Sequence, residues 1–189
     1  MGSLSIKSDN RRLLYYNEVL LLKQNIPHVI TSLRLVILPH LVYSINNQIT
    51  LIAFALFLFA IGTDLVDGYV ARKLNSNSKL GGYLDVSFDF VFIAGIYLNF
   101  VINGIYSPLI LFIIFGFFTQ FILSNFLLKQ TTYDPIGKYY GSLLFGGIGL
   151  TLLFSNQITY DIVTYGIVIS TLISLISRIT YFIIGRNNK

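Results

Sequence analysis

The chain contains no cysteine, few charged residues and only eight acidic side chains among its 189 residues. Without cysteine it has neither a disulfide framework nor a thiolate metal site. Charged residues make up 11% of the chain and hydrophobic residues 54%, and the mean hydropathy is +0.72. These values exclude an ordinary soluble domain. They predict an all-α integral membrane protein, with residues 1–189 forming a single domain.

Six apolar segments are long enough to cross a bilayer, and they lie at residues 28–46, 48–73, 80–103, 107–128, 139–156 and 160–185. The connections between them are short, so neighbouring segments are expected to be antiparallel. This six-helix bundle, residues 28–185, is preceded by a polar tail and a mixed stretch within residues 1–27. Residues 11–24 are too short to span, and we expect them to form a short helix in the membrane interface.

Eleven of the thirteen basic residues lie at the ends of the chain or in its connections, where they are distributed unevenly, and Arg34 and Arg178 lie within segments. Four precede the first segment, three flank the turn after the second, two lie between the fourth and fifth, and two follow the sixth. The other connections, near residues 46, 103 and 156, carry none. Because basic loops stay in the cytoplasm, both termini and the turn after the second segment are predicted to face it, in the cytoplasmic (plasma) membrane. The net charge of +5 is thus a topology signal, and no nucleic-acid partner is expected.

Half of the acidic residues fall in one short stretch, D-L-V-D-G-Y-V-A-R-K-L-N-S-N-S-K-L-G-G-Y-L-D-V-S-F-D. Asp64 and Asp67 share one helical stripe, and Asp85 and Asp89 share another. The polar run 75–78 between them is typical of a turn, which predicts an antiparallel helix pair. Asp67 and Asp85 would lie roughly 8–9 Å from the turn, and Asp64 and Asp89 about 12–15 Å from it. The two carboxylate pairs are therefore expected to meet at matched depths.

Four facing carboxylates do not all stay ionised without cations. Oxygen ligands suit Mg²⁺, Mn²⁺ or Ca²⁺, and two such ions would clamp and polarise a phosphoryl group. The glycines and Ala71 leave room for a large substrate. Four independent capping aspartates fit the shared stripes poorly. A cation carrier or channel is a rival interpretation, but no carboxylates continue toward the other face and Arg72 has no role in it. A catalytically dead scaffold is a third, which the presence of all four aspartates disfavours.

The spacing D-x2-D-G-x2-A-R-x8-G-x3-D-x3-D, over 26 residues, resembles the signature of the CDP-alcohol phosphotransferases. The resemblance implies a membrane enzyme that transfers a lipid phosphate, phosphatidyl or archaetidyl, from a CDP-linked lipid to a small soluble alcohol and releases CMP. It also implies a homodimer and two Mg²⁺ or Mn²⁺ ions. In these terms Asp64 and Asp85 would bridge both ions, Asp67 would complete one site and Asp89 the other. Asp89 would also accept the proton of the acceptor hydroxyl.

The same resemblance assigns binding of the CDP-linked lipid to Gly68, Ala71, Arg72, Ser78 and Gly81. The run N-I-P-H-V-I-T-S-L-R also resembles the first span of phosphatidylglycerophosphate synthases in this family, which lies near the CDP group. Thr31 and Arg34 are therefore predicted to contact the nucleotide phosphates or a motif carboxylate. A structural ion pair, or snorkelling of Arg34 to the interface, is the other interpretation.

Lys138 and Arg178 lie at similar depth near the predicted cytoplasmic side, where two cations would hold an acceptor phosphate. The Gly-Lys pair at Lys138 resembles glycerophosphate-using relatives, although Tyr139 and Phe90 depart from their pattern. The favoured acceptor is glycerol phosphate, then inositol phosphate, with serine or another unphosphorylated alcohol as the alternative. Lys138 alone also fits a topology signal.

Glycines concentrate in the fifth segment, at positions 141, 146, 147 and 149. Close helix packing is the first interpretation, and a cavity wall for the lipid donor is the second. Most of the many Phe and Tyr residues are expected to face lipid or the interface and to carry no chemistry.

Overall fold

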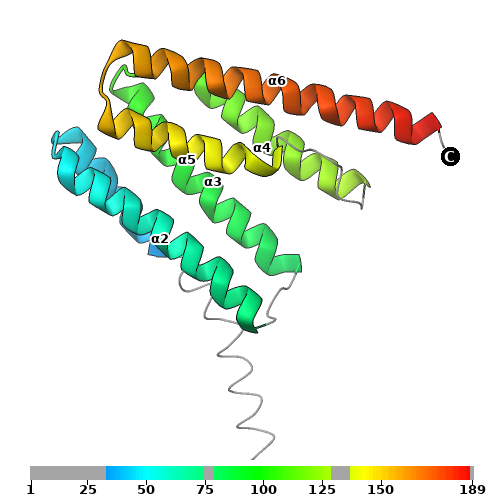
Figure 1. The fold of residues 1–189 in the computed structure, drawn as a ribbon, viewed down its shortest axis with the longest axis horizontal. Helices are drawn as coiled ribbons and strands as arrows, with labels where there is room; N and C mark the ends of the chain where they lie inside the picture. The colour runs from blue at the N-terminus through cyan, green and yellow to red at the C-terminus, as the bar shows by residue number, and fades with distance from the viewer. Residues whose placement is uncertain (1–32, 75–78, 129–136, 188–189) are drawn as a thin grey trace, which may run out of the picture.

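In a computed structural model the chain is described at residues 33–74, 79–128 and 137–187. The regular elements of these ranges are all helices. A first helix, Leu33–Asn46, precedes those labelled in Figure 1, which are α2 (Thr50–Leu74), α3 (Lys79–Ile102), α4 (Leu109–Leu128), α5 (Gly137–Leu153) and α6 (Gln157–Asn187). The expected interfacial helix at 11–24 lies outside the described residues.

The predicted segments agree closely with these helices. The largest differences are at α5, which ends at Leu153 rather than 156, and at α6, which begins at Gln157 rather than 160. Asn156 explains the early start of α6. Its side-chain oxygen accepts a hydrogen bond from the backbone N–H of Thr159 at 2.9 Å, which caps the helix.

Membrane crossing is supported by composition at one helix in particular. Among the described residues, Gln157–Ser177 of α6 is the one stretch both long enough and apolar enough to span a bilayer. The apolar stretches of the other helices are shorter, such as Leu33–Asn46 and Val86–Ile102. Large apolar side chains nevertheless point outward on several helices, including Leu51 and Phe112. A surface of this kind is unfavourable in water and suits contact with lipid.

Helix α5 lies at the centre of the packing (Figure 1) and contacts α2, α3 and α6, while α4 packs on α3 and α6. Helices α2 and α3 run in opposite directions, as predicted. Among the described residues, however, they do not pack directly on each other. Phe57 of α2 instead packs at Gly149 of α5, where an added Cβ would lie 3.1 Å from the phenylalanine ring. Glycine on α5 thus directs α2 toward the fifth helix.

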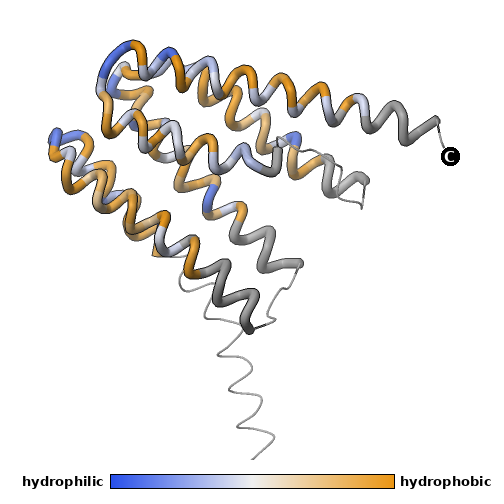
Figure 2. The backbone as a smooth tube through the Cα atoms, viewed as in Figure 1, coloured by the Kyte–Doolittle hydropathy of each residue, from blue (hydrophilic) through white to orange (hydrophobic). Residues whose placement is uncertain are grey.

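One end of the bundle is tied by neutral polar groups. The Asn46 side-chain oxygen accepts hydrogen bonds from the amides of Asn99 and Asn103, both at 2.9 Å. The hydroxyls of Tyr106 and Thr151 are 2.5 Å apart. Burial raises the pKa of the Tyr106 phenol to about 12, so this phenol stays neutral. Figure 2 shows hydrophilic positions gathered at the helix connections of this end.

The opposite end holds the last turns of α2, α4 and α6 and the first turns of α3 and α5, because successive helices reverse direction (Figure 1). Residues 75–78 and 129–136, which connect α2 to α3 and α4 to α5 in the sequence, lie outside the described residues. The basic connections of the sequence and the carboxylate motif therefore belong to the same end of the molecule.

Candidate active site

The carboxylate motif is divided between two helices. Asp64 and Asp67 fall within α2, and Asp85 and Asp89 fall within α3. Asp89 is ten residues after Lys79, which places it about 15 Å along α3 from its first residue. Its side chain is the one of the four that the structure describes, so the matched depths of the two carboxylate pairs stay a prediction.

The described carboxylate is paired with a cation from another helix. The guanidinium Nη1 of Arg34, on the first helix, forms an ion pair with Oδ1 of Asp89. Arg34 is 1% exposed and Asp89 29% exposed. A guanidinium at this burial is stable only with anionic or hydrogen-bonding partners, and such burial is incompatible with snorkelling. The structure therefore excludes snorkelling and shows a contact with a motif carboxylate. Both a role in the site and a structural ion pair are consistent with this contact.

Three contacts hold the first helix along α3 in a parallel direction. Arg34 meets Asp89 at one end, Leu38 packs at Gly95, and Asn46 accepts a hydrogen bond from Asn99 at the other end. An added Cβ at Gly95 would lie 2.8 Å from Leu38 Cδ2, so the missing side chain lets the helices approach. The position of Arg34 against Asp89 is thus set by the whole helix interface.

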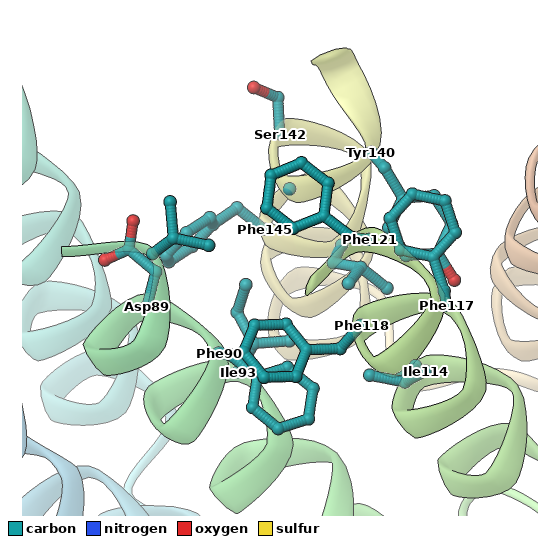
Figure 3. A pocket seen from close by; sticks show the side chains of 13 residues that line it. Asp89, Phe90, Ile93, Ile114, Phe117, Phe118, Phe121, Tyr140, Ser142 and Phe145 are labelled. Atoms are coloured by element: carbon teal, nitrogen blue, oxygen red, sulfur yellow. The ribbon is translucent and has the colours of Figure 1, made fainter. Parts of the chain in front are cut away.

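A cavity of about 400 Å³ begins at Asp89 and extends between α3, α4 and α5 (Figure 3). Its walls are mainly aromatic, from Phe90, Phe117, Phe118, Phe121, Tyr140 and Phe145. Phe90 stacks on Phe118, and Phe117 stacks on Tyr140, each with ring centroids 3.7 Å apart.

Two of these aromatic side chains are exceptions to the expectation that most aromatic residues face lipid or the interface. Phe117 is 7% exposed and Tyr140 3% exposed, and both line the cavity. Sequence reasoning missed the cavity because aromatic residues in an apolar helix look alike whether they face lipid or the interior. The available signal was Gly141, in the small-faced fifth segment, which also lines it.

Among the glycines of α5, one permits close packing and another lines a cavity. That the cavity receives the lipid donor stays a prediction. An added Cβ at Gly147 would lie 2.6 Å from the Tyr97 hydroxyl and 2.9 Å from Val163 Cγ1, so this glycine permits close packing. An added Cβ at Gly141 would meet nothing within 4 Å, and Gly141 borders open cavity space instead.

The remaining predicted site residues are not placed by their side chains. Thr31 and Ser78 lie outside the described residues. The others fall within helices but their side chains are outside the description, namely Gly68, Ala71, Arg72, Gly81, Lys138 and Arg178. Among the side chains that are described, no three His, Cys, Asp or Glu residues gather. The donor set of the motif, four carboxylates on two helices, nevertheless suits a hard divalent cation.

Comparison with known proteins adds the following. The sequence profile described as CDP-alcohol phosphatidyltransferase matches residues 24–181. A CDP-diacylglycerol–glycerol-3-phosphate 3-phosphatidyltransferase of Aquifex aeolicus (strain VF5) is 26% identical over 157 residues, which cover 82% of this chain and 88% of the relative. Proteins of the same name are 37% identical in Pseudomonas fluorescens, over 37% of each chain, and 34% identical in Escherichia coli (strain K12), over 37% of this chain and 40% of the relative.

Proposed function

Since the chain belongs to the CDP-alcohol phosphatidyltransferase family, we propose that it transfers the phosphatidyl group of a CDP-linked lipid to glycerol phosphate and releases CMP. The observation that carries this proposal is that the complete motif, from Asp64 to Asp89, lies inside the matched residues. The relative from Aquifex aeolicus, which is named for this reaction, supports the choice of acceptor.

Asp89 is the proposed base. Its carboxylate accepts the proton of the acceptor hydroxyl while that oxygen bonds to the lipid-bearing phosphorus. The bond from this phosphorus to the oxygen of CMP breaks, and CMP leaves with the electron pair. Arg34 positions the base, because its ion pair limits rotation of the Asp89 side chain. Asp89 is partly exposed at the edge of the cavity, so an acceptor hydroxyl can approach it.

We assign the binding of two Mg²⁺ or Mn²⁺ ions to Asp64, Asp67, Asp85 and Asp89, because four carboxylates need counter-charge. When bound, such ions neutralise charge on the pyrophosphate and on the departing CMP. The Asp64→Asn and Asp85→Asn variants are each expected to lose turnover, and calorimetric titration should show weakened Mn²⁺ binding. Wild-type activity that persists in excess EDTA would contradict a metal requirement.

Acceptor binding is assigned to Lys138 and Arg178. Binding of the CDP-linked lipid is assigned to Thr31, Arg34, Gly68, Ala71, Arg72, Ser78 and Gly81. The proposal includes six membrane crossings with the motif end of the bundle in the cytoplasm, supported by the basic connections at that end. It also includes a homodimer, supported by family resemblance alone.

The deciding experiment supplies the purified protein in lipid vesicles with radiolabelled CDP-diacylglycerol and a panel of acceptors. Glycerol 3-phosphate is expected to give a phosphorylated lipid product and CMP, with inositol phosphate and serine as comparison arms. Product from serine in preference to glycerol phosphate would replace the proposed acceptor. Cation flux into vesicles without CMP release would instead support the carrier interpretation.

A further inference from the structure

The apolar cavity between α3, α4 and α5 is not used by the chemistry described so far. We propose that it receives one hydrocarbon chain of the CDP-linked lipid donor. This inference rests on the proposed function, since it requires the lipid phosphorus to react beside Asp89.

The lining of the cavity excludes a polar occupant. Apart from Asp89, its described polar groups are few and are placed at the edge or already bonded. The Tyr140 hydroxyl is 2.8 Å from the hydroxyl of Thr171, and Ser142 is exposed at the rim. Asp89 itself pairs with Arg34. A sugar, phosphate or nucleobase would lose its hydrogen bonds with water in this space without regaining them.

Size and shape suit a hydrocarbon chain. The volume of about 400 Å³ falls within the range of small-ligand pockets, roughly 300–1,000 Å³. The lining extends from Val86 to Ile93 along α3 and from Ile114 to Phe121 along α4, which corresponds to about 10 Å along each helix. The buried ends, Ile93 and Ile114, are 3% and 1% exposed. The cavity is therefore about 10 Å long, and its inner end is formed by buried apolar side chains.

Continuity with the candidate active site selects the donor lipid as occupant. The reacting phosphorus of a CDP-linked lipid is joined through a glycerol unit to its two chains, so a phosphorus beside Asp89 brings the first methylenes to the cavity. Figure 3 shows Asp89 at one side of the space and the rings of Phe118, Phe121 and Phe145 facing into it.

Gly141 offers a way to fill the cavity without disturbing the fold. It lines the cavity, and an added Cβ meets nothing within 4 Å. Gly146, on the same helix, also has nothing within 4 Å of an added Cβ and is not part of the cavity lining. Gly141→Leu and Gly146→Leu are thus matched variants that differ in whether the substituted position lines the cavity.

The first test compares kcat/KM of both variants for butanoyl and oleoyl CDP-diacylglycerol in mixed micelles. Gly141→Leu is expected to lower kcat/KM for the oleoyl donor about tenfold more than for the butanoyl donor, because the leucine side chain overpacks a space that only the longer chain fills. Gly146→Leu should leave the ratio between the donors unchanged. Equal losses for both donors in Gly141→Leu, or the same selectivity in Gly146→Leu, would overturn the proposal. Turnover of the butanoyl donor, whose chains are too short to fill the cavity, reports that each variant is folded.

The second test does not depend on turnover. A CDP-diacylglycerol with a photoactivatable diazirine near one chain terminus should label α4 between Ile114 and Phe121 of the wild-type protein, and Gly141→Leu should reduce that labelling. Labelling confined to other helices would place the chains elsewhere. Because the chain has no cysteine, Phe118→Cys also tests whether a second copy fills the space. A disulfide between copies at this position would contradict occupancy by lipid. If wild type labels in α4 yet releases no CMP with any acceptor, the proposed reaction fails while the chain site stands.

Discussion

At the scale of single residues, the central observation is a buried arginine on a carboxylate that we assign as the base. An arginine can fix the orientation of a carboxylate through two parallel donors, whereas a lysine provides a point charge. We expect Arg34→Ala to lower kcat at least tenfold with little change in KM for glycerol phosphate. Arg34→Lys should recover part of the lost kcat, because it restores charge without the planar geometry. Steady-state kinetics with both variants measures kcat and KM separately and so checks this prediction.

The opposite outcomes for Arg34 are also informative. If Arg34→Ala raises KM for the CDP-linked lipid and leaves kcat unchanged, Arg34 contacts the nucleotide phosphates in the working enzyme instead. If the variant is unstable but its folded fraction has full kcat, the ion pair is structural. The thermal unfolding midpoint of each purified variant separates these two cases.

A second contrast separates the base from the acceptor contact. Asp89→Asn keeps size but cannot accept the proton, so kcat should fall by roughly 10²–10⁴-fold while the CDP-linked lipid still binds. Lys138→Ala should raise KM for glycerol phosphate by a factor equivalent to about 1.5–3 kcal/mol, the range for a charged hydrogen bond. KM for the lipid donor should change little. If Lys138→Ala has no effect on the acceptor, an unphosphorylated alcohol becomes the better assignment.

At the scale of the helices, glycine determines which faces meet. Gly147→Ala would place a methyl group 2.6 Å from the Tyr97 hydroxyl, which itself donates to the Leu144 carbonyl at 3.2 Å. We expect a loss of about 1–3 kcal/mol in unfolding free energy, as for other overpacked interiors. Gly146→Ala, with open space around the new methyl, is the matched control and should unfold like wild type. Adding Tyr97→Phe to Gly147→Ala should recover part of the loss, and equal stability of all three would contradict the steric explanation.

The helices themselves could be predicted from the sequence because long apolar runs and polar turns are local signals. Their partners could not. The contact of Phe57 with Gly149 joins residues far apart in the chain, and no local pattern indicates that α2 packs on α5 rather than on α3. For the same reason, the sequence did not show which partner Arg34 contacts, and only the fold places it against Asp89. Gly141 and Gly147 look identical in sequence, and only their neighbours in the fold show that one opens a cavity while the other tightens a contact.

At the scale of the whole molecule, two ends of different chemistry define the bundle. One carries neutral amide and hydroxyl contacts, such as those of Asn46, and the other carries the motif and the basic connections. Helix α6 has 31 residues, about 46 Å of helix, which exceeds a hydrocarbon core of roughly 30 Å. One end of α6 therefore extends past the bundle, as Figure 1 shows for its C-terminal part. A membrane helix of this length suits a chain whose last residues reach the aqueous side.

The predicted orientation follows from this difference between the ends. Because the chain lacks cysteine, single cysteines report their own side without background labelling. Asn77→Cys, in the predicted turn within the motif, should react with a membrane-impermeant maleimide only after the cells are broken open and the cytoplasmic face of the membrane is accessible. Ser155→Cys is expected to react from outside intact cells, since Ser155 is exposed at the neutral end and its hydroxyl has only a 3.4 Å contact with the Thr151 carbonyl. Reversed labelling would place the motif outside, away from cytoplasmic CDP-linked substrates, and would contradict the proposed function as well as the charge rule. Labelling of both positions from the same side would instead contradict an odd number of crossings between them, and with it the six-span arrangement.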